Sequence, residues 1–274
     1  MPKEKPELSD AMRKKLSGSS REKKPINGTK FTIAISSAKG GVGKSTFATN
    51  LALALKQNGC KVGLLDADIY GPSIPKMFGI NEKPKSDGQK LEPVIKYDIQ
   101  CMSIGFLTDE KTPMIWRGPM VTSAIKTFTQ QVNWKDLDFI IVDMPPGTGD
   151  TQLTFSQGIE MDGAIIVSTP QEVALLDVKR GIKMFDKLNV KVLGLVDNMS
   201  FFVGDDGKKY NIFGEGGVKK TAEEFNKDFL GEIPINPDVG KQGDLGLPIV
   251  EKDPQHEISK IYLDLAKKLK SIFF

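Results

Sequence analysis

Short apolar runs alternate along the chain with longer segments whose apolar residues recur at helical spacing. Several of the short runs are apolar at consecutive positions, which is typical of parallel strands that are buried on both faces. The predicted strands cover residues 31–36, 62–65, 99–104, 139–142, 164–168, 192–196 and 229–233. The predicted helices cover residues 45–57, 119–131, 171–188, 217–226 and 258–272. This order predicts an α/β fold, a doubly wound and mostly parallel sheet with helices on both faces.

The last predicted helix has a continuous apolar stripe. The stripe consists of Ile258, Ile261, Tyr262, Leu265, Leu269 and Ile272. Such a stripe favours a helix that docks on the sheet. The lysines near the end of this helix and the terminal Phe273 and Phe274 leave a second interpretation open, in which the helix lies in a membrane interface.

The first 28 residues differ in charge from the remainder. Residues 1–30 hold nine Lys and Arg against four Asp and Glu, so the rest of the chain has a formal charge of −2. We expect residues 1–28 to be a flexible, solvated arm, and we do not expect nucleic acid as a partner. Residues 29–274 show no internal repeat and no long linker, which predicts one domain there.

Composition narrows the functional classes. With 39% hydrophobic and 27% charged residues, the chain is typical of a soluble globular protein. No apolar run approaches the roughly 18 residues that span a bilayer, and no secretory signal is evident, so a cytoplasmic location is expected and a membrane partner is not. Two cysteines cannot build a disulfide framework and one histidine cannot build a histidine metal cluster. Zinc hydrolases and most triad enzymes are therefore disfavoured.

A glycine-rich loop between the first strand and the first helix carries the clearest chemistry. It contains Ala38, Lys39, Gly40, Gly41, Val42, Gly43, Lys44, Ser45 and Thr46. The backbone N–H groups of such a loop, together with the helix N-terminus, converge on phosphate oxygens. We expect Lys44 to bind the β- and γ-phosphates of ATP and the Ser45 hydroxyl to ligate Mg²⁺. The loop departs from the GxxxxGK[ST] pattern, because Ala38 replaces the first glycine and Lys39 adds a second lysine.

Acidic residues follow two of the predicted strands. Asp66 and Asp68 come after strand 62–65, and Asp143 comes after strand 139–142. An aspartate at the tip of an apolar strand beside a phosphate loop is placed to contact Mg²⁺, directly or through water. Asp143 is therefore the Walker B candidate, and Asp68 is a second candidate for the metal.

These residues resemble a known group of ATPases. Lys39 in the deviant loop is similar to the second lysine of the group that includes MinD, ParA and the nitrogenase iron protein. Further strings between residues 31 and 273 resemble the Mrp/ApbC branch of that group, whose members are iron–sulfur cluster carriers. The strings are DADIYGPS (66–73), WRGP (116–119), DMPPGTGD (143–150), NMS (198–200) and IFGEGG (212–217).

The resemblance implies a homodimer with ATP at the subunit interface. It implies that Lys39 reaches the nucleotide of the partner subunit and that Asp68 orients the hydrolytic water, so Lys39, Lys44 and Asp68 are the expected catalytic residues. It also implies that Asn198 recognises the adenine, with the 234–238 loop nearby. The implied function is ATP hydrolysis linked to iron–sulfur cluster assembly, with apoprotein clients or cluster scaffolds as partners.

The chain departs from that branch at the cluster ligands. The branch has a C-x-x-C pair shortly after the Asn-Met-Ser string, whereas residues 201–207 here read FFVGDDG, which predicts a turn. Cys60 and Cys101 lie beside and within predicted strands, where free cysteines usually fill the core. We expect no bridging cluster of the usual kind, and whether any cluster is bound stays open.

Two other functions stay open beside the cluster carrier. In the first, ATP switches dimerisation of a positioning protein in the MinD or ParA manner, and the dimer binds a membrane or another surface. The basic C-terminal helix keeps this alternative open. The second is a small-molecule kinase, for which the sequence offers no recognisable acceptor site.

Overall fold

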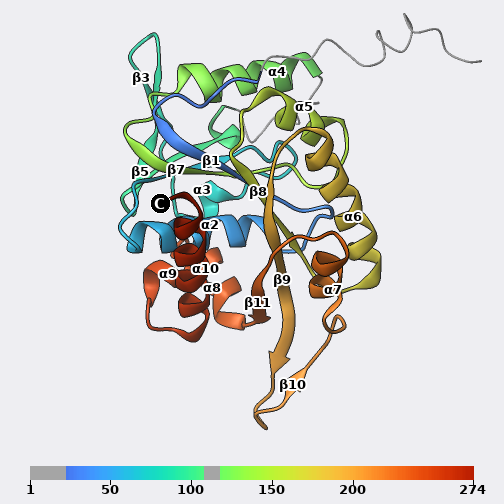
Figure 1. The fold of residues 1–274 in the computed structure, drawn as a ribbon. Coiled ribbons are helices and arrows are strands. Elements are labelled where there is room, and N and C mark those ends of the chain that lie inside the picture. Colours follow the sequence, from blue (N-terminus) through green and yellow to red (C-terminus); the bar gives the residue numbers. More distant parts are fainter. Residues whose placement is uncertain (1–22, 108–117) are drawn as a thin grey trace, which may run out of the picture.

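The computed structural model describes residues 23–107 and 118–274 (Figure 1). Within these residues the central sheet has nine strands, and its order is β10-β9-β8-β1-β7-β2-β6-β5, with β11 also paired to β9. The strands are β1 (Thr29–Ser36), β2 (Val62–Asp66), β5 (Val94–Lys96), β6 (Ile99–Ser103), β7 (Leu137–Asp143), β8 (Gly163–Ser168), β9 (Val192–Val203), β10 (Lys209–Tyr210) and β11 (Phe229–Ile235).

Most of these strands run in parallel, as predicted. β1 pairs in parallel with β7 and β8, β2 with β7 and β6, and β9 with β8 and β11. The antiparallel pairs of this sheet are at its ends, β5 with β6 and β10 with β9. Every residue of β2 and β8 is buried, which explains why both strands are apolar at nearly every position.

Helices cover both faces of the sheet (Figure 1). Side chains from α2 (Lys44–Gln57), α9 (Ile249–Lys252) and α10 (Glu257–Phe273) share one apolar core. Side chains from α4 (Gly118–Lys126), α5 (Asp150–Gly158), α6 (Glu172–Lys187) and α7 (Gly217–Glu224) share the other. Along β1 the two cores alternate, since Ile33 and Ile35 belong to the first and Ala34 to the second.

The remaining elements are short. They are α3 (Ile74–Met77), β3 (Lys85–Ser86), β4 (Leu91–Glu92), a 3₁₀ turn (Ile104–Phe106), a π-helical turn after α4 (Thr127–Gln131) and α8 (Pro237–Asp244). The five predicted helices are confirmed, with the one expected at 119–131 divided into α4 and the π-helical turn.

Helix α5 was not predicted from the sequence, and strand β9 ends later in the chain than predicted. Helix α5 is weakly apolar, and its buried side chains include the polar Gln152 and Ser156 beside Phe155, so the helical stripe is hidden. Strand β9 continues seven residues beyond the predicted end because β10 folds back on it through a turn at residues 204–208. Asn198 therefore lies inside a strand and not just past one.

The predicted boundary of the N-terminal arm, at residue 28, is wrong. Lys24 forms a parallel bridge with Ile159, and the Ile26 side chain is buried in the core shared by α4 and α5. The Lys23 ammonium also donates to the Leu188 carbonyl at 2.6 Å. Residues 23–28 thus belong to the folded body, and residues 1–22 of the expected arm lie outside the described residues.

Helix α10 docks on the sheet, as its stripe predicted. Ile258, Tyr262 and Leu265 are buried in the core that α2 also enters. The Phe273 ring lies 4.6 Å from the Phe31 ring, so the helix is anchored up to its last turn. None of the helices in the described residues is long and apolar enough to cross a membrane.

Candidate nucleotide site

The loop between β1 and α2 is shaped by two left-handed glycines. Gly41 and Gly43 have φ angles of +81° and +83°, which disfavour any residue with a Cβ. Space also requires glycine at position 43, where a Cβ would lie 2.3 Å from the Asn198 amide nitrogen. Among the described residues, no side chain caps the N-terminus of α2, and its first turn holds no acidic residue, so its N–H groups and dipole are available to the adjoining cleft. This end of α2 is suited to bind an anion.

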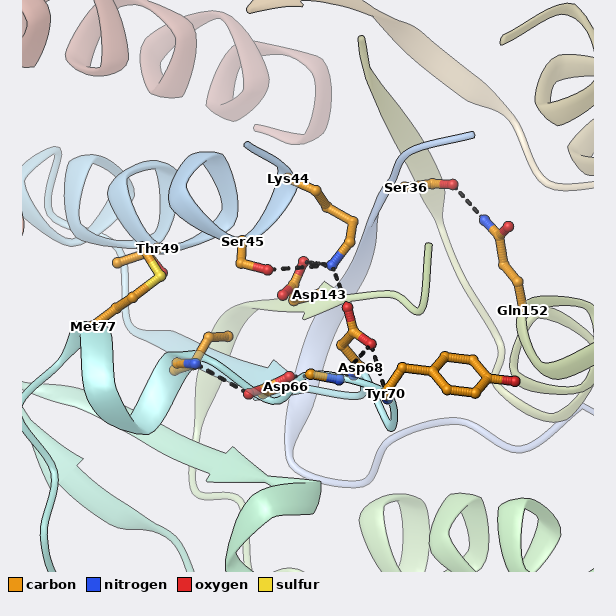
Figure 2. A network of polar contacts seen from close by, with 12 residues as sticks. Ser36, Lys44, Ser45, Thr49, Asp66, Asp68, Tyr70, Met77, Asp143 and Gln152 are labelled. Carbon is orange, nitrogen blue, oxygen red and sulfur yellow. Dashed lines mark hydrogen bonds and ion pairs between the residues drawn. The ribbon is translucent and has the colours of Figure 1, made fainter. Parts of the chain in front are cut away.

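Lys44 is the positive centre of the site (Figure 2). Its side chain is nearly buried, and its ammonium lies 2.6 Å from Asp143 Oδ1, 3.4 Å from Asp68 Oδ2 and 3.3 Å from Ser45 Oγ. These residues come from the N-terminus of α2, the end of β7 and the loop after β2. Four predicted site residues are thus brought together around one ammonium group.

Asp143 is completely buried, and its Oδ2 has no hydrogen-bond partner in the part of the chain that the structure describes. Burial raises the pKa of this carboxyl, against the opposing effect of Lys44. A buried carboxylate with one unused oxygen beside the Ser45 hydroxyl matches the oxygen donors that Mg²⁺ takes from a protein when phosphates supply further ligands. The residues present therefore fit a magnesium ion.

Asp66 holds both ends of the loop that carries Asp68. Its Oδ1 accepts from the Asp68 N–H at 3.2 Å, and its Oδ2 accepts from the Ile74 N–H at 3.1 Å and the Ser103 hydroxyl at 3.0 Å. Asp68 in turn accepts from the N–H groups of Tyr70 and Gly71. Burial and the nearby Asp143 raise the pKa of Asp66 to about 7. From the sequence, Asp66 was recognised only as an acidic residue that follows a strand. Its role as the anchor of this loop is seen only in the structure.

The phosphate loop lines a cleft of about 510 Å³. The cleft is also lined by side chains and backbone from α3, α8 and the loop after β7. Its lining residues are Ser37, Gly40, Gly41, Gly43, Lys44, Ser45, Thr46, Asp68, Ser73, Lys76, Met77, Pro146, Met199, Val239, Gly240, Gly243 and Asp244. Helix α8 was not predicted, although Asn236, which caps it by accepting from the Asp238 N–H, and Pro237 are helix-start signals.

Three predicted residues lie apart from the Lys44 cluster. Ala38 is half-buried at the start of the loop, and Lys39 is exposed, with no side-chain hydrogen bond or ion pair to any described residue. Asn198 is buried, and its amide nitrogen donates to the Val42 carbonyl at 2.8 Å. This bond fixes the phosphate loop to β9. Recognition of adenine by Asn198 stays a prediction, and the predicted neighbouring loop at 234–238 is instead the end of β11 and the start of α8.

The first turn of α5 contacts the site in a way that the sequence did not reveal. The Gln152 amide donates to the Ser36 hydroxyl at the end of β1, and Thr151 Oγ1 is hydrogen-bonded to the Tyr70 hydroxyl. Tyr70 follows Asp68 closely in the chain. The structure describes only Gly118 and Pro119 of the WRGP string, because Trp116 and Arg117 lie outside the described residues.

Both cysteines are buried in the core that α2 shares with the sheet. Burial raises the pKa of the Cys60 and Cys101 thiols above the ordinary value, which disfavours the thiolate that binds iron. Residues 204–207 form the turn that was predicted within 201–207, with Gly207 in the left-handed region. Across the described residues, no three His, Cys, Asp or Glu side chains form a group that could hold a metal ion.

Comparison with known proteins identifies the family. A model of the NUBPL iron-transfer P-loop NTPases within the ParA group matches residues 28–270. The chain belongs to this family. It is 49% identical to the iron-sulfur cluster carrier protein of Aquifex aeolicus over 254 residues, covering 91% of this chain and 70% of the relative. It is also 49% identical to the mouse iron-sulfur cluster transfer protein NUBPL, covering 90% of this chain and 79% of the relative.

Solved structures support the same assignment. The nucleotide-binding protein of Archaeoglobus fulgidus in complex with ADP is 40% identical, with a TM-score of 0.73, over 82% of this chain and 90% of that one. The cell division ATPase MinD of Pyrococcus furiosus is 20% identical with a TM-score of 0.66, over 88% of this chain and 99% of that one, which is a likeness of fold. The predicted kinship with the Mrp/ApbC branch and its MinD- and ParA-like fold is confirmed.

Proposed function

We propose that this member of the NUBPL family hydrolyses ATP to ADP and phosphate and uses the nucleotide cycle to carry or assemble iron–sulfur clusters. The observation that carries the proposal is the Lys44 cluster, in which one nearly buried ammonium contacts Asp143 and Asp68 at the mouth of an uncapped helix. Phosphoryl transfer depends on positioning and charge stabilisation, and these residues supply both.

Each residue of the cluster has a separate role in the proposal. Lys44 binds the phosphates by exchanging its carboxylate partners for phosphate oxygens. Ser45 and Asp143 hold Mg²⁺, which neutralises phosphate charge when bound, and Asp68 is a further candidate for its coordination shell. Asp68 also orients the attacking water, held in place by the N–H groups of Tyr70 and Gly71.

We further propose that the active species is a homodimer with ATP at its interface. The exposure of Lys39, whose side chain has no partner among the described residues, supports a role beyond its own subunit. In this arrangement Lys39 of one subunit stabilises charge on the nucleotide of the other. Asn198 would recognise the adenine from the back of the same cleft, where its neighbour Met199 already lines the wall.

The cluster itself is the cargo in this proposal. A bridging cluster held by four thiolates does not fit this chain, because the two cysteines are buried and apart from the 204–207 turn. We therefore place this protein as an ATPase that works with a scaffold or apoprotein partner holding the cluster thiolates. Two of the relatives described above, a cluster carrier protein and a cluster transfer protein, support this placement.

Two measurements test the proposal. The first is Mg²⁺-dependent phosphate release from ATP by the purified protein, with Lys44→Ala as the inactive control. The second is transfer of a cluster from a loaded scaffold to an apoenzyme that needs a [4Fe–4S] cluster, measured with and without ATP. Absence of ATP hydrolysis by the dimer, or equal transfer with and without this protein, would overturn the corresponding half of the proposal.

A further inference from the structure

A second polar cavity lies at the base of the β9–β10 hairpin, apart from the nucleotide cleft. It has a volume of about 130 Å³. Its lining residues are Asp197, Ser200, Phe201, Lys209, Asn211, Glu215, Gly216 and Glu232. Three of these side chains are acidic and one is basic, so the cavity carries a net negative charge.

Asp197 is the unusual residue of this cavity. It is 1% exposed, and its Oδ1 has no hydrogen-bond partner in residues 23–107 and 118–274. The parallel pairing of β9 with β11 sets Glu232 directly beside it, on the same side of the sheet. Burial, reinforced by Glu232, raises the pKa of Asp197 to about 7. A buried carboxylate without a cation is costly, so Asp197 keeps its proton up to about neutral pH, and a positively charged ligand would be stabilised here by taking the place of that proton.

Within the described residues, the cation that lines the cavity is not ion-paired with its acids. Lys209 is the basic residue of the cavity lining, and its ammonium lies over the Phe201 ring, 4.2 Å from the ring centre. Asp197 forms no ion pair with any described residue. Asp197, Glu215 and Glu232 all line the cavity, but no His, Cys, Asp and Glu side chains in the described ranges lie in a group of three that could hold a metal ion, which disfavours a metal here.

The surroundings of the cavity point to a protein ligand. Val203 and Ile212 are large apolar side chains that are exposed on the hairpin and just after it. Val203 pairs directly with Lys209 across the hairpin, so an exposed apolar side chain shares a face with a residue of the cavity. Apolar side chains around a pocket that takes one charged side chain are typical of the centre of a protein interface.

We propose that this cavity binds the guanidinium group of an arginine on a partner protein, which docks on the exposed apolar residues of the hairpin. Two carboxylates on neighbouring strands suit the planar, forked donors of arginine better than the single ammonium of lysine. The cavity of about 130 Å³ has room for a guanidinium group. The site is distinct from the nucleotide cleft, so it does not depend on the function proposed above.

A peptide pair tests the site on the full-length protein. The probe is acetyl-Ala-Phe-Arg-Phe-Ala-amide, and the control is the same peptide with citrulline, which has the shape of arginine without its charge. Binding is followed by NMR or calorimetry. We expect the arginine peptide to bind at least tenfold tighter than the citrulline peptide, and Asp197→Asn to remove this preference. Glu82→Gln removes an exposed acid elsewhere and should leave it unchanged.

The pH dependence provides a second readout. Because Asp197 titrates near neutral pH beside Glu232, with Glu215 and Lys209 as the other titratable groups of the lining, the preference should be several-fold larger at pH 8 than at pH 6. Equal binding of the two peptides, or an undiminished preference in Asp197→Asn, would overturn the proposal. Sedimentation of Asp197→Asn identifies the other possible occupant: loss of dimerisation would show that a second copy of this chain fills the cavity and would also overturn it.

Discussion

The hydroxyls of Tyr70 and Thr151 are hydrogen-bonded at 2.9 Å, although 81 residues separate them in the chain. Tyr70 belongs to the loop in which Asp68 is held, and Thr151 to the first turn of α5, which follows the Asp143 loop. The bond therefore joins the two acidic loops on either side of Lys44. The Tyr70 ring is 69% exposed, so packing contributes little to this link and the hydroxyl is its main component.

Removing the Tyr70 hydroxyl should slow catalysis without weakening nucleotide binding. A hydrogen bond of this kind contributes about 0.5–1.5 kcal/mol, so Tyr70→Phe should lower the single-turnover rate of ATP hydrolysis about twofold to tenfold. Thr151→Val should have the same effect, and the double variant should lose no more than either single one. Tyr210→Phe, which removes a hydroxyl bound to Asp206 on the β9–β10 hairpin, is the matched control. Additive losses in the double variant would refute the link.

Lys44→Ala should lose about a hundredfold in ATP affinity, because a charge-assisted contact to phosphate is removed. Calorimetry measures the loss directly. Lys76→Ala is the matched control, since Lys76 lines the same cleft but is exposed and only loosely paired with Asp244, at 3.8 Å. Equal affinities of the wild type and Lys44→Ala would contradict the assignment of the phosphate site.

Lys39→Ala and Asp68→Asn should separate binding from hydrolysis. Lys39 is exposed and Asp68 contacts the Lys44 ammonium only at 3.4 Å, so neither change removes the main phosphate-binding group. We expect both variants to bind ATP within a few-fold of the wild type and to hydrolyse it at least tenfold more slowly in a single turnover. If Lys39 acts on the partner's nucleotide, mixing the two inactive variants should restore activity in half of the sites of the mixed dimers. Wild-type rates in both variants would rule out these roles.

The convergence of Lys44, Asp68 and Asp143 could be predicted because the topology requires it. β7 lies between β1 and β2 in a parallel sheet, so the residues that follow the three strands meet at one edge. The anchoring by Asp66 and the Tyr70–Thr151 bond could not be predicted, since they depend on how loops distant in sequence pack. Helix α5 could not be predicted for a related reason. Its residue Gln152 is buried with its amide hydrogen-bonded to Ser36, but a polar residue in a sequence is normally assigned to the surface, so the helix shows no apolar stripe.

Asp197→Asn should gain stability relative to the wild type as the pH rises from 5 to 8. The pKa of Asp197 is about 7 in the folded protein and about 3.9 in an unfolded chain, so the folded state binds the proton more tightly. The stability that this proton contributes is complete below pH 4 and is lost as the pH rises through 7. Asparagine has no such loss, and Asp66 titrates equally in both proteins. The variant should gain roughly 2 kcal/mol over the wild type between pH 5 and pH 8, after allowance for screening by solvent in the cavity.

Denaturant unfolding of the two proteins at pH 5 and pH 8 measures this difference. The Glu82→Gln variant serves as the control for a change in overall charge, because Glu82 is exposed and remote from the cavity in sequence. A stability difference between Asp197→Asn and the wild type that does not change with pH would show that the carboxyl is ionised at both pH values.

The protein should bind little iron, because neither of its cysteines is accessible. A cluster of the family's usual kind needs two accessible thiolates per subunit, and here Cys101 is fully buried while Cys60 is nearly so. Burial also keeps both thiols protonated at neutral pH, so binding iron would cost the exposure of core residues together with deprotonation. We therefore expect the purified protein to bind little iron after anaerobic reconstitution with iron and sulfide.

The double variant Cys60→Ala and Cys101→Ala separates the possible outcomes. Alanine is preferred to serine at position 101 because a hydroxyl there would be buried in the apolar core shared with Leu64 and Ile99. ATP hydrolysis should remain within a few-fold of the wild type, since neither cysteine lines the nucleotide cleft. About four irons per dimer in the wild type, lost in the double variant, would show that the core opens to bind a cluster and that the cysteines are its ligands.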